Sequence, residues 1–528
     1  MRKILYILGI LSVLTSCSFL DVQPSDIYKT DNFYTTEKDL VSALNGVYAP
    51  MTESALYGQM ISGRMGLQGD LGYNNNTVDI NTVAENMATT SDAKIRGYWL
   101  TCYKGISNAN LLIANINNAD DISEENRLTV LGEARFLRAY YYFLLVSKFG
   151  GVPLRTEPVE GGDADNLQIA RSTSKEIYDF IISEMEFAAG AVRDISEVTS
   201  PGVVSKSAVW GILARVCLYN AGYPNYADGM YEKARKYAKK VIHSGKHSLN
   251  PDYRQVFINY MQDVYDFNES IWEVEFYGND KTAYNSVAGS IGRCTGPRNK
   301  NLNTTIGYCL GTVRTNQYHY SLYDETDVRR DWNIAGFYYD SETDALAVEL
   351  PNVWSRYAGK FRREYEVVQP SVNDVGPGNF PLLRYADVLL MFAEAYAADL
   401  YADPADEVFA YECFNRVRRR AHAMDQYQHD GTVDFPMTSN KSAFLEEIQN
   451  ERARELAFEM LRKDDLVRWG IFYQRMKSSE MMPPTSISEG LFNYCSRCIN
   501  NVEPKDVLWP IPSSEMNVNA KLIQNEGW

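Results

Sequence analysis

Apolar residues recur every three or four positions over much of the chain, the spacing of one face of an α-helix. From residue 127 to 149 this pattern is continuous and predicts a long amphipathic helix that ends at Gly150. Thr173 and Glu176 stand at the spacing of a capping box and predict the start of another helix. Helices therefore dominate the first half of the chain.

Two further stretches have the pattern of helical hairpins. Residues 205–219 and 231–243 carry small residues at facing positions, which lets two helices approach closely. The unit is about 40 residues long, near the length of a tetratricopeptide unit. Residues 382–400 and 407–423 form a second such pair, and residues 441–461 predict a last strong helix.

The middle of the chain breaks this periodicity. Residues 277–381 are rich in Gly, Asn, Tyr and Thr, and residues 269–276 alternate like a short strand. A long irregular stretch with many aromatic residues is more typical of a functional region than of a disordered one. We expect a mainly α-helical scaffold, residues 41–276 and 382–528, that carries a loop-rich ligand-binding insertion and a few short strands.

The first residues have the layout of a secretory signal peptide. A basic start precedes an apolar run at residues 4–13, which is too short to span a bilayer. Small residues then lead to Cys17, as in a bacterial lipobox, where the cysteine is acylated and becomes the first mature residue. We expect residues 1–16 to be removed and residues 17–40 to form a lipidated segment. The alternative is an ordinary signal peptide with a chance cysteine.

Charge and composition reduce the number of possible functions. The net charge of −16 argues against nucleic acid as a partner. The 37 tyrosines are the compositional outlier, and tyrosine suits both packing between helices and contact with sugar rings. No phosphate-binding loop, nucleophile elbow or H-E-x-x-H motif is present. The acidic residues are too many for sequence to show or exclude a glycosidase pair.

The cysteines give weak signals. Cys495 and Cys498 form a C-x-x-C pair without the second pair of ligands that zinc requires, so no metal site is predicted. A local disulfide there, or between Cys294 and Cys309, is left open. With Cys17 lipidated, seven of the eight cysteines remain, so at least one is unpaired within the chain.

Several phrases, in order along nearly the whole chain, resemble the SusD/RagB family of outer-membrane nutrient-binding lipoproteins. They are residues 17–24 (CSFLDVQP), 133–143 (EARFLRAYYYF) with 149–154 (FGGVPL), 383–390 (LRYADVLL), 451–459 (ERARELAFE) and 508–512 (LWPIP).

This resemblance implies a scaffold of four tetratricopeptide-like helix pairs that supports a more irregular half. It implies a non-catalytic protein without a cofactor, anchored by lipid to the outer membrane and exposed at the cell surface. Its partner would be a TonB-dependent transporter of the SusC type, over which it sits as a lid. The ligand would be an oligosaccharide or, as in the RagB branch, a peptide.

The charged residues of these phrases are predicted to be structural. Arg135, Arg138, Arg384, Arg452 and Glu455 lie on expected amphipathic helices, where charge pairs at a spacing of three or four residues are ordinary. We expect them to tie helix pairs together and not to contact ligand.

Candidate ligand-binding residues are aromatic, amide and carboxylate side chains in the irregular segments, since sugars stack on aromatic faces and bond to planar polar groups. For each of them ordinary packing is the alternative. The candidates are Asp70, Tyr73, Asn75, Trp99, Tyr277, Tyr308, Tyr318 and Tyr320.

Overall fold

The computed structural model describes residues 33–59, 67–75, 83–159, 168–279, 287–300, 306–340, 347–367 and 375–528. The expected signal segment and Cys17 lie outside the described residues. The fold is mainly helical with a few short strands, which confirms the predicted fold class.

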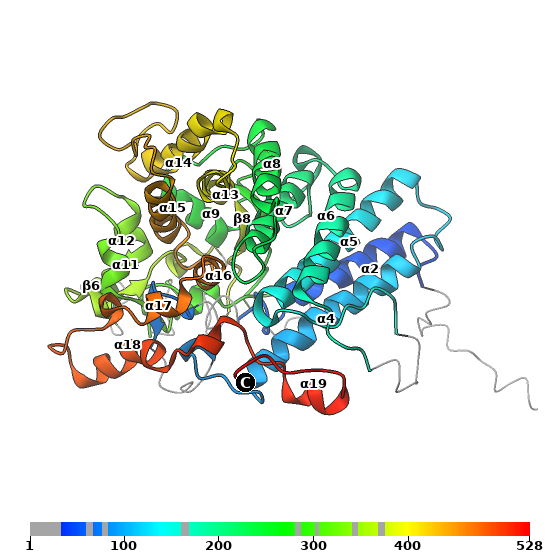
Figure 1. Cartoon of the computed structure of the whole chain (residues 1–528), viewed down its shortest axis with the longest axis horizontal. Coiled ribbons are helices and arrows are strands. Elements are labelled where there is room, and N and C mark those ends of the chain that lie inside the picture. The colour runs from blue at the N-terminus through cyan, green and yellow to red at the C-terminus, as the bar shows by residue number, and fades with distance from the viewer. Residues whose placement is uncertain are drawn as a thin grey trace, which may run out of the picture.

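Long helices form the scaffold, and each packs on a neighbour in chain order (Figure 1). After α8 the chain leaves this array, and it returns with α13, which packs directly on α8. All the strands except β1, which precedes α4, lie in the excursion between them, together with several short helices. The scaffold helices are α2 (Glu37–Tyr48), α4 (Ala93–Ala114), α5 (Glu124–Phe149), α6 (Ser174–Ala191), α7 (Lys206–Ala221), α8 (Met230–His243), α13 (Tyr385–Ala398), α14 (Glu407–Ala421) and α15 (Lys441–Glu455).

Local sequence explains where these helices begin and end. The hydroxyl of Thr173 accepts a hydrogen bond from the backbone N–H of Glu176, and the Glu176 carboxylate accepts one from the backbone N–H of Thr173, which confirms the predicted capping box. Gly150 ends α5 with φ of 70°, a conformation that favours glycine. The helices predicted from periodicity are therefore found within a few residues of their expected bounds.

The excursion and the C-terminal region contain shorter elements. The strands are β1 (Gly72–Asn74), β2 (Ser270–Val274), β3 (Val313–Thr315), β4 (Ile334–Ala335), β5 (Phe337–Tyr339), β6 (Ala347–Glu349), β7 (Tyr357–Ala358) and β8 (Phe380–Arg384). The short helices are α9 (Tyr253–Gln262), α10 (Ile291–Cys294), α11 (Gln317–Ser321), α12 (Arg329–Asn333), α16 (Arg462–Arg468), α17 (Phe472–Met476), α18 (Glu489–Asn501) and α19 (Ser513–Val518).

Three small antiparallel sheets organise this region. The largest has the order β1-β3-β7-β4, and the other two pair β2 with β8 and β5 with β6. The strand predicted at residues 269–276 is β2, but all five of its residues are buried, so its alternation does not mark a solvent-facing side. Trp272 in β2 packs against Phe136 and Tyr140 of α5, which joins this sheet to the scaffold.

Two predicted helices are shorter than expected. The helix expected from residue 382 begins at Tyr385, because the preceding residues pair with β2 as strand β8. The helix expected to reach residue 461 ends at Glu455, and Phe458 and Met460 then adopt positive φ values of 61° and 67°. Apolar spacing continues past both ends, so periodicity alone overestimated these helices.

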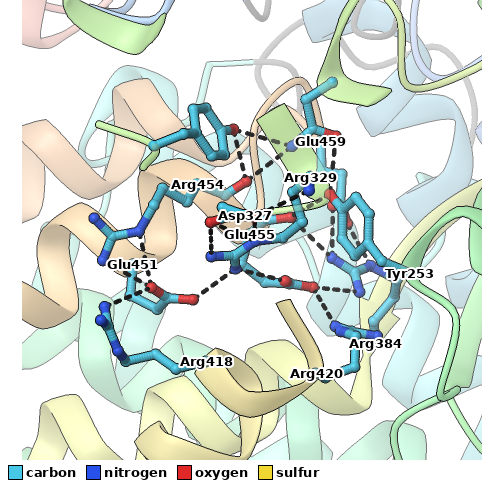
Figure 2. A network of polar contacts seen from close by, with 12 residues as sticks. Tyr253, Asp327, Arg329, Arg384, Arg418, Arg420, Glu451, Arg454, Glu455 and Glu459 are labelled. Atoms are coloured by element: carbon cyan, nitrogen blue, oxygen red, sulfur yellow. Dashed lines mark hydrogen bonds and ion pairs between the residues drawn. The ribbon is translucent and has the colours of Figure 1, made fainter. Parts of the chain in front are cut away.

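A buried network of ion pairs joins these elements (Figure 2). Arg384, at the end of β8, lies 2.8 Å from Glu269, 3.0 Å from Glu455 and 2.7 Å from Glu459. Arg420 of α14 also contacts Glu455, at 2.7 Å. The network therefore connects α14 and α15 to the β2–β8 sheet, and it stabilises the junction between the scaffold and the excursion.

The predicted structural role of the charged phrases is confirmed, but their expected pairing within single helices is mostly wrong. Arg135 and Arg138 of α5 both contact Glu184 of α6, at 2.5 Å. Arg384 does not pair with Asp387, whose partners are Arg215 at 2.6 Å and Arg452 at 2.7 Å. Tertiary packing brings these charges together across elements.

The cysteines of the described residues are buried, and none of them forms a disulfide bond with another. This includes both pairs for which a disulfide was left open, Cys294 with Cys309 and Cys495 with Cys498. Burial raises the pKa of Cys309 to about 12, so its thiol stays protonated at neutral pH.

Candidate functional site

The four-stranded sheet joins two polar segments that are far apart in the sequence. Strand β1, from the segment that contains the candidates Asp70, Tyr73 and Asn75, pairs with β3 of the excursion, and Tyr73 stands opposite Arg314. The backbone N–H of Asn75 continues the pairing with a bond to the carbonyl of Thr312 at 2.8 Å. The sheet thus builds one surface from both regions that the sequence singled out for ligand binding.

A group of polar and aromatic side chains gathers on this sheet, and we call it the Tyr357 cluster: Asn75, Arg298, Arg314, Tyr338 and Tyr357. Arg314 lies over the ring of Tyr357, 4.6 Å from its centroid, and Arg298 lies over Tyr338 at 4.7 Å. These are favourable cation–π distances. Four of the five side chains are partly exposed, and Tyr357 is buried beneath them.

Backbone contacts hold the Tyr357 cluster in place. Strand register sets Arg314 opposite Tyr357, and Arg314 also donates to the carbonyl of Ser355 at 3.0 Å. The carbonyl oxygen of Arg298 accepts a bond from Tyr339 in β5 at 2.9 Å, which attaches the β5–β6 hairpin to the cluster. The arginine positions therefore follow from strand pairing.

Asn75 is the predicted site residue that belongs to this cluster. Its amide, oriented with the carbonyl oxygen toward Arg314, accepts from Nε and Nη2 at 3.1 Å each. The amide nitrogen then remains as a donor on the partly exposed side chain. Burial raises the pKa of Tyr357, while Arg314 and Arg298 act in the opposite direction, so its hydroxyl stays protonated.

Tyr320 lies beside the same sheet, next to Arg330 and Arg356. Their guanidinium carbons are 5.4 Å and 5.0 Å from its ring centroid. Arg356 immediately precedes Tyr357 in the chain, and successive side chains of extended backbone point to opposite faces. We therefore describe Tyr320 as a neighbour of the Tyr357 cluster and not as a member of it.

Tyr277 lies in a separate concavity of about 550 Å³, which we call the Tyr277 pocket. Tyr277 is 62% exposed and Tyr265 is 38% exposed, and both line this pocket. Its volume falls in the ordinary range for small-ligand sites. The charged residues of its lining are all acidic: Asp263, Glu273 and Glu275.

Asn379 organises the acidic side of the Tyr277 pocket. Its amide nitrogen donates to Asp263 and to Glu273, at 3.0 Å each, and its oxygen accepts from the backbone N–H of Phe276 at 2.9 Å. Burial raises the pKa of Glu273 to about 8, and the nearby Glu275 and Asp263 act in the same direction. Glu273 is therefore mostly protonated at neutral pH.

Four predicted site residues lie inside the protein and bond or pack there. Asp70 forms an ion pair with Arg462 at 2.7 Å, and the Tyr73 hydroxyl donates to the Trp354 carbonyl. Trp99 is 3% exposed, and Tyr318 lies under Arg475. Tyr308 is partly exposed beside Arg363, which binds its carbonyl oxygen.

The structure therefore does not gather the eight predicted residues into one site. It separates the Tyr357 cluster, which contains Asn75, from the Tyr277 pocket. Sequence reasoning missed Arg298 and Arg314, because arginine was not sought as a ligand group, and it did not single out Tyr338 and Tyr357 among the many tyrosines. The sequence did hold a signal for the two arginines, since residues 281–323 contain basic residues but no Asp or Glu.

Two features are absent from the described part of the chain. No helix there is long and apolar enough to cross a membrane. No group of three or more His, Cys, Asp or Glu side chains there is arranged to hold a metal ion.

Known proteins match this chain over nearly its whole length. The SusD family model matches residues 268–528, and a model described as "Starch-binding associating with outer membrane" matches residues 18–218. SusD-like protein P25 of Formosa agariphila is 24% identical over 563 residues, covering 99% of this chain and 98% of the relative. Starch-binding protein SusD of Bacteroides thetaiotaomicron is 22% identical, covering 78% and 75%.

Solved structures share the fold. A SusD homolog from Bacteroides thetaiotaomicron aligns with a TM-score of 0.85 at 26% identity, covering 94% of this chain and 98% of that one. Surface glycan-binding protein A from Bacteroides fluxus aligns with a TM-score of 0.72 at 22% identity, covering 94% and 100%. Together with the two family models, these matches show that the chain belongs to the SusD/RagB family.

Proposed function

We propose that this protein binds oligosaccharides at the cell surface without altering them and delivers them to a SusC-like TonB-dependent transporter. The observation that carries the proposal is the Tyr357 cluster, where two sequence-distant polar segments form one surface of aromatic, amide and guanidinium groups. Such groups stack on sugar rings and bond to their hydroxyls. The starch-binding descriptions of the family model and of one relative support a glycan as ligand.

Glycan binding can be tested on the full-length protein extracted in detergent, with a glycan array and a peptide library as parallel ligands. We expect binding to glycans, and Tyr338→Ala should weaken it by about tenfold, since loss of a stacking face costs roughly 1 kcal/mol or more. Tyr401→Ala is the control, because Tyr401 is 93% exposed and lies outside both candidate sites. Binding to peptides alone would replace this proposal with the RagB-like alternative.

The absence of catalysis has its own test. The bound glycan should be recovered intact after prolonged incubation, with no new reducing ends. Release of reducing ends that Glu273→Gln or Glu275→Gln abolishes would indicate a glycosidase instead, because two carboxyl groups across a cleft are the requirement for that reaction.

Lipid anchoring is proposed from the lipobox-like sequence before Cys17. Cys17→Ser should move the protein from the membrane fraction to the soluble fraction, because the acyl chains supply its membrane affinity. Retention of the variant in the outer membrane without acylation would contradict this.

A transporter of the SusC type should co-purify after mild extraction, and repeated isolation of the protein alone would count against the partnership.

A further inference from the structure

Acidic residues are absent from the part of the chain that surrounds β3. The protein has 68 acidic and 52 basic side chains, yet residues 281–323 contain no Asp or Glu. The same residues include Lys281, Arg293, Arg298, Lys300 and Arg314. This segment is therefore locally positive in a protein whose net charge is −16.

The sheet concentrates two of these charges at the Tyr357 cluster. A Cβ atom built on Gly311 would lie 2.6 Å from the Tyr357 ring and 3.1 Å from the Cβ of Arg298. Arg298 and Tyr357 therefore pack against the same short stretch of backbone. Arg314 stacks on Tyr357 from the paired strand. The guanidinium of Arg298 lies over Tyr338, so each of the two charges covers a different ring of the cluster.

Neither arginine forms an ion pair with a carboxylate within the described ranges, in contrast to the arginines of Figure 2. Both side chains are partly exposed. Arg314 already donates to Asn75, Ser355 and the Tyr357 hydroxyl, so it offers a ligand its charge and its remaining N–H group. The guanidinium of Arg298 makes no hydrogen bond to any described residue, so its edge N–H groups are available. Those edges match the paired oxygens of a carboxylate or a sulfate.

We propose that the ligand of the Tyr357 cluster is an acidic glycan, whose uronate carboxylates or sulfate esters bind Arg298 and Arg314. This inference rests on the proposed glycan-binding function and specifies the substrate class. Tyr338 and the amide of Asn75 would contact the sugar ring and its hydroxyls. The positive segment would offset the repulsion that the net negative charge of the protein exerts on an anionic polymer.

The test compares polymers that differ in charge alone. The full-length protein in detergent is titrated with polygalacturonate and with its methyl ester, and with dextran sulfate and neutral dextran. We expect at least one charged polymer to bind about tenfold or more tightly than its neutral counterpart, with an affinity that falls as salt increases. The two pairs distinguish carboxylate from sulfate recognition.

Substitutions in the Tyr357 cluster test whether its arginines cause the preference for charged polymers. Arg298→Gln and Arg314→Gln should each weaken binding of the charged polymer by about tenfold, because each change removes a positive charge that would face the anionic group. Arg254→Gln is the matched control, since Arg254 is exposed on α9 and pairs with Asp252. The control should bind like the unchanged protein.

The outcomes separate this inference from the proposed function. Equal affinity for charged and neutral polymers, or failure of all charged polymers to bind, would overturn the acidic-glycan inference. Binding of neutral glycans in the same assay would leave the proposed function intact. Polyglutamate that binds as tightly as the charged glycans would overturn the assignment of a sugar, because charge alone would then account for binding.

Discussion

At the scale of single residues, buried charge is the main structural feature of this protein. Glu455 is fully buried and contacts Arg384, Arg420 and Arg329 at 2.7 to 3.0 Å. Burial alone would raise the pKa of Glu455, but these arginines outweigh burial and hold the pKa below its ordinary value. Such a network tolerates the loss of one member poorly, because the remaining charges stay buried without a partner.

Glu455→Gln should therefore lower the free energy of unfolding by about 3–5 kcal/mol. Denaturant titration followed by circular dichroism measures this change. Glu125→Gln is the control, because Glu125 is exposed on α5, and it should change stability by less than about 0.5 kcal/mol. Equal stability of the two variants would show that the network contributes little.

A pH dependence follows from Asp387. Burial would raise the pKa of Asp387, but Arg452 and Arg215 lower it from 3.8 to about 2. The folded carboxyl is thus more acidic than the unfolded one, so its contribution is complete above pH of about 4 and is lost as the pH falls toward 2. This contribution is about 2 kcal/mol.

The unfolding free energy lost in Asp387→Asn should therefore be largest at neutral pH and shrink as the pH falls below about 4. Parallel denaturant titrations between pH 7 and pH 3 measure the difference. Asp120→Asn, which removes an exposed acid, corrects for general effects of charge. A stability difference that stays constant over this pH range would contradict the lowered pKa of Asp387.

At the scale of elements, helix packing depends on small residues at close contacts. A Cβ atom on Gly105 of α4 would lie 2.2 Å from the ring of Tyr141 on α5. A Cβ atom on Gly211 of α7 would lie 2.3 Å from Leu383 of β8. The small residues seen in the sequence of α7 therefore allow a strand, as well as another helix, to approach closely.

Gly105→Ala should destabilise the protein by about 1–3 kcal/mol, because Tyr141 must move within a packed core. Gly190→Ala is the matched change on α6, where a Cβ atom would meet nothing within 4 Å. It should stabilise the helix by up to about 1 kcal/mol. Thermal unfolding of both variants measures the two effects, and a shift of the same sign for both would refute the packing argument.

The elements themselves were largely predictable, and their ends less so. Apolar spacing and the capping box at Thr173 and Glu176 correctly predicted the helices from α5 to α8. The same spacing failed at residues 382–384 and after Glu455, where the chain is buried on all sides. A buried strand and a buried helix segment have similar apolar patterns. The pairing of β8 with β2 and the positive φ values of Phe458 and Met460 set these two ends.

At the scale of the whole molecule, the contact that determines the proposed ligand site is the pairing of β1 with β3. Gly72 makes this pairing possible, because a Cβ atom there would lie 2.1 Å from the carbonyl oxygen of Arg314. The contact places Asn75 beside Arg314 and thereby completes the Tyr357 cluster. The proposed site therefore depends on a strand pair of only three residues on each side.

Gly72→Ala should weaken glycan binding by about tenfold, which corresponds to about 1.4 kcal/mol, because the added carbon separates the two strands. The helical scaffold does not include β1, so the main thermal transition should change little. Gly431→Ala, where a Cβ atom would meet nothing within 4 Å, is the control for both measurements. Unchanged binding in Gly72→Ala would show that β1 does not shape the ligand site.

The sequence by itself determined the helical class, the helix starts, the family and the polar segments in which a ligand site was expected, because all of these depend on local spacing or on motifs in order. The tertiary structure alone decided which charges pair and which candidates are accessible. Asp70 and Tyr73 have the chemistry of ligand groups, yet Asp70 forms an ion pair with Arg462 and Tyr73 donates to the Trp354 carbonyl inside the protein. Asn75 and Arg314 meet because two strands pair across more than two hundred residues, a relationship that local sequence does not contain.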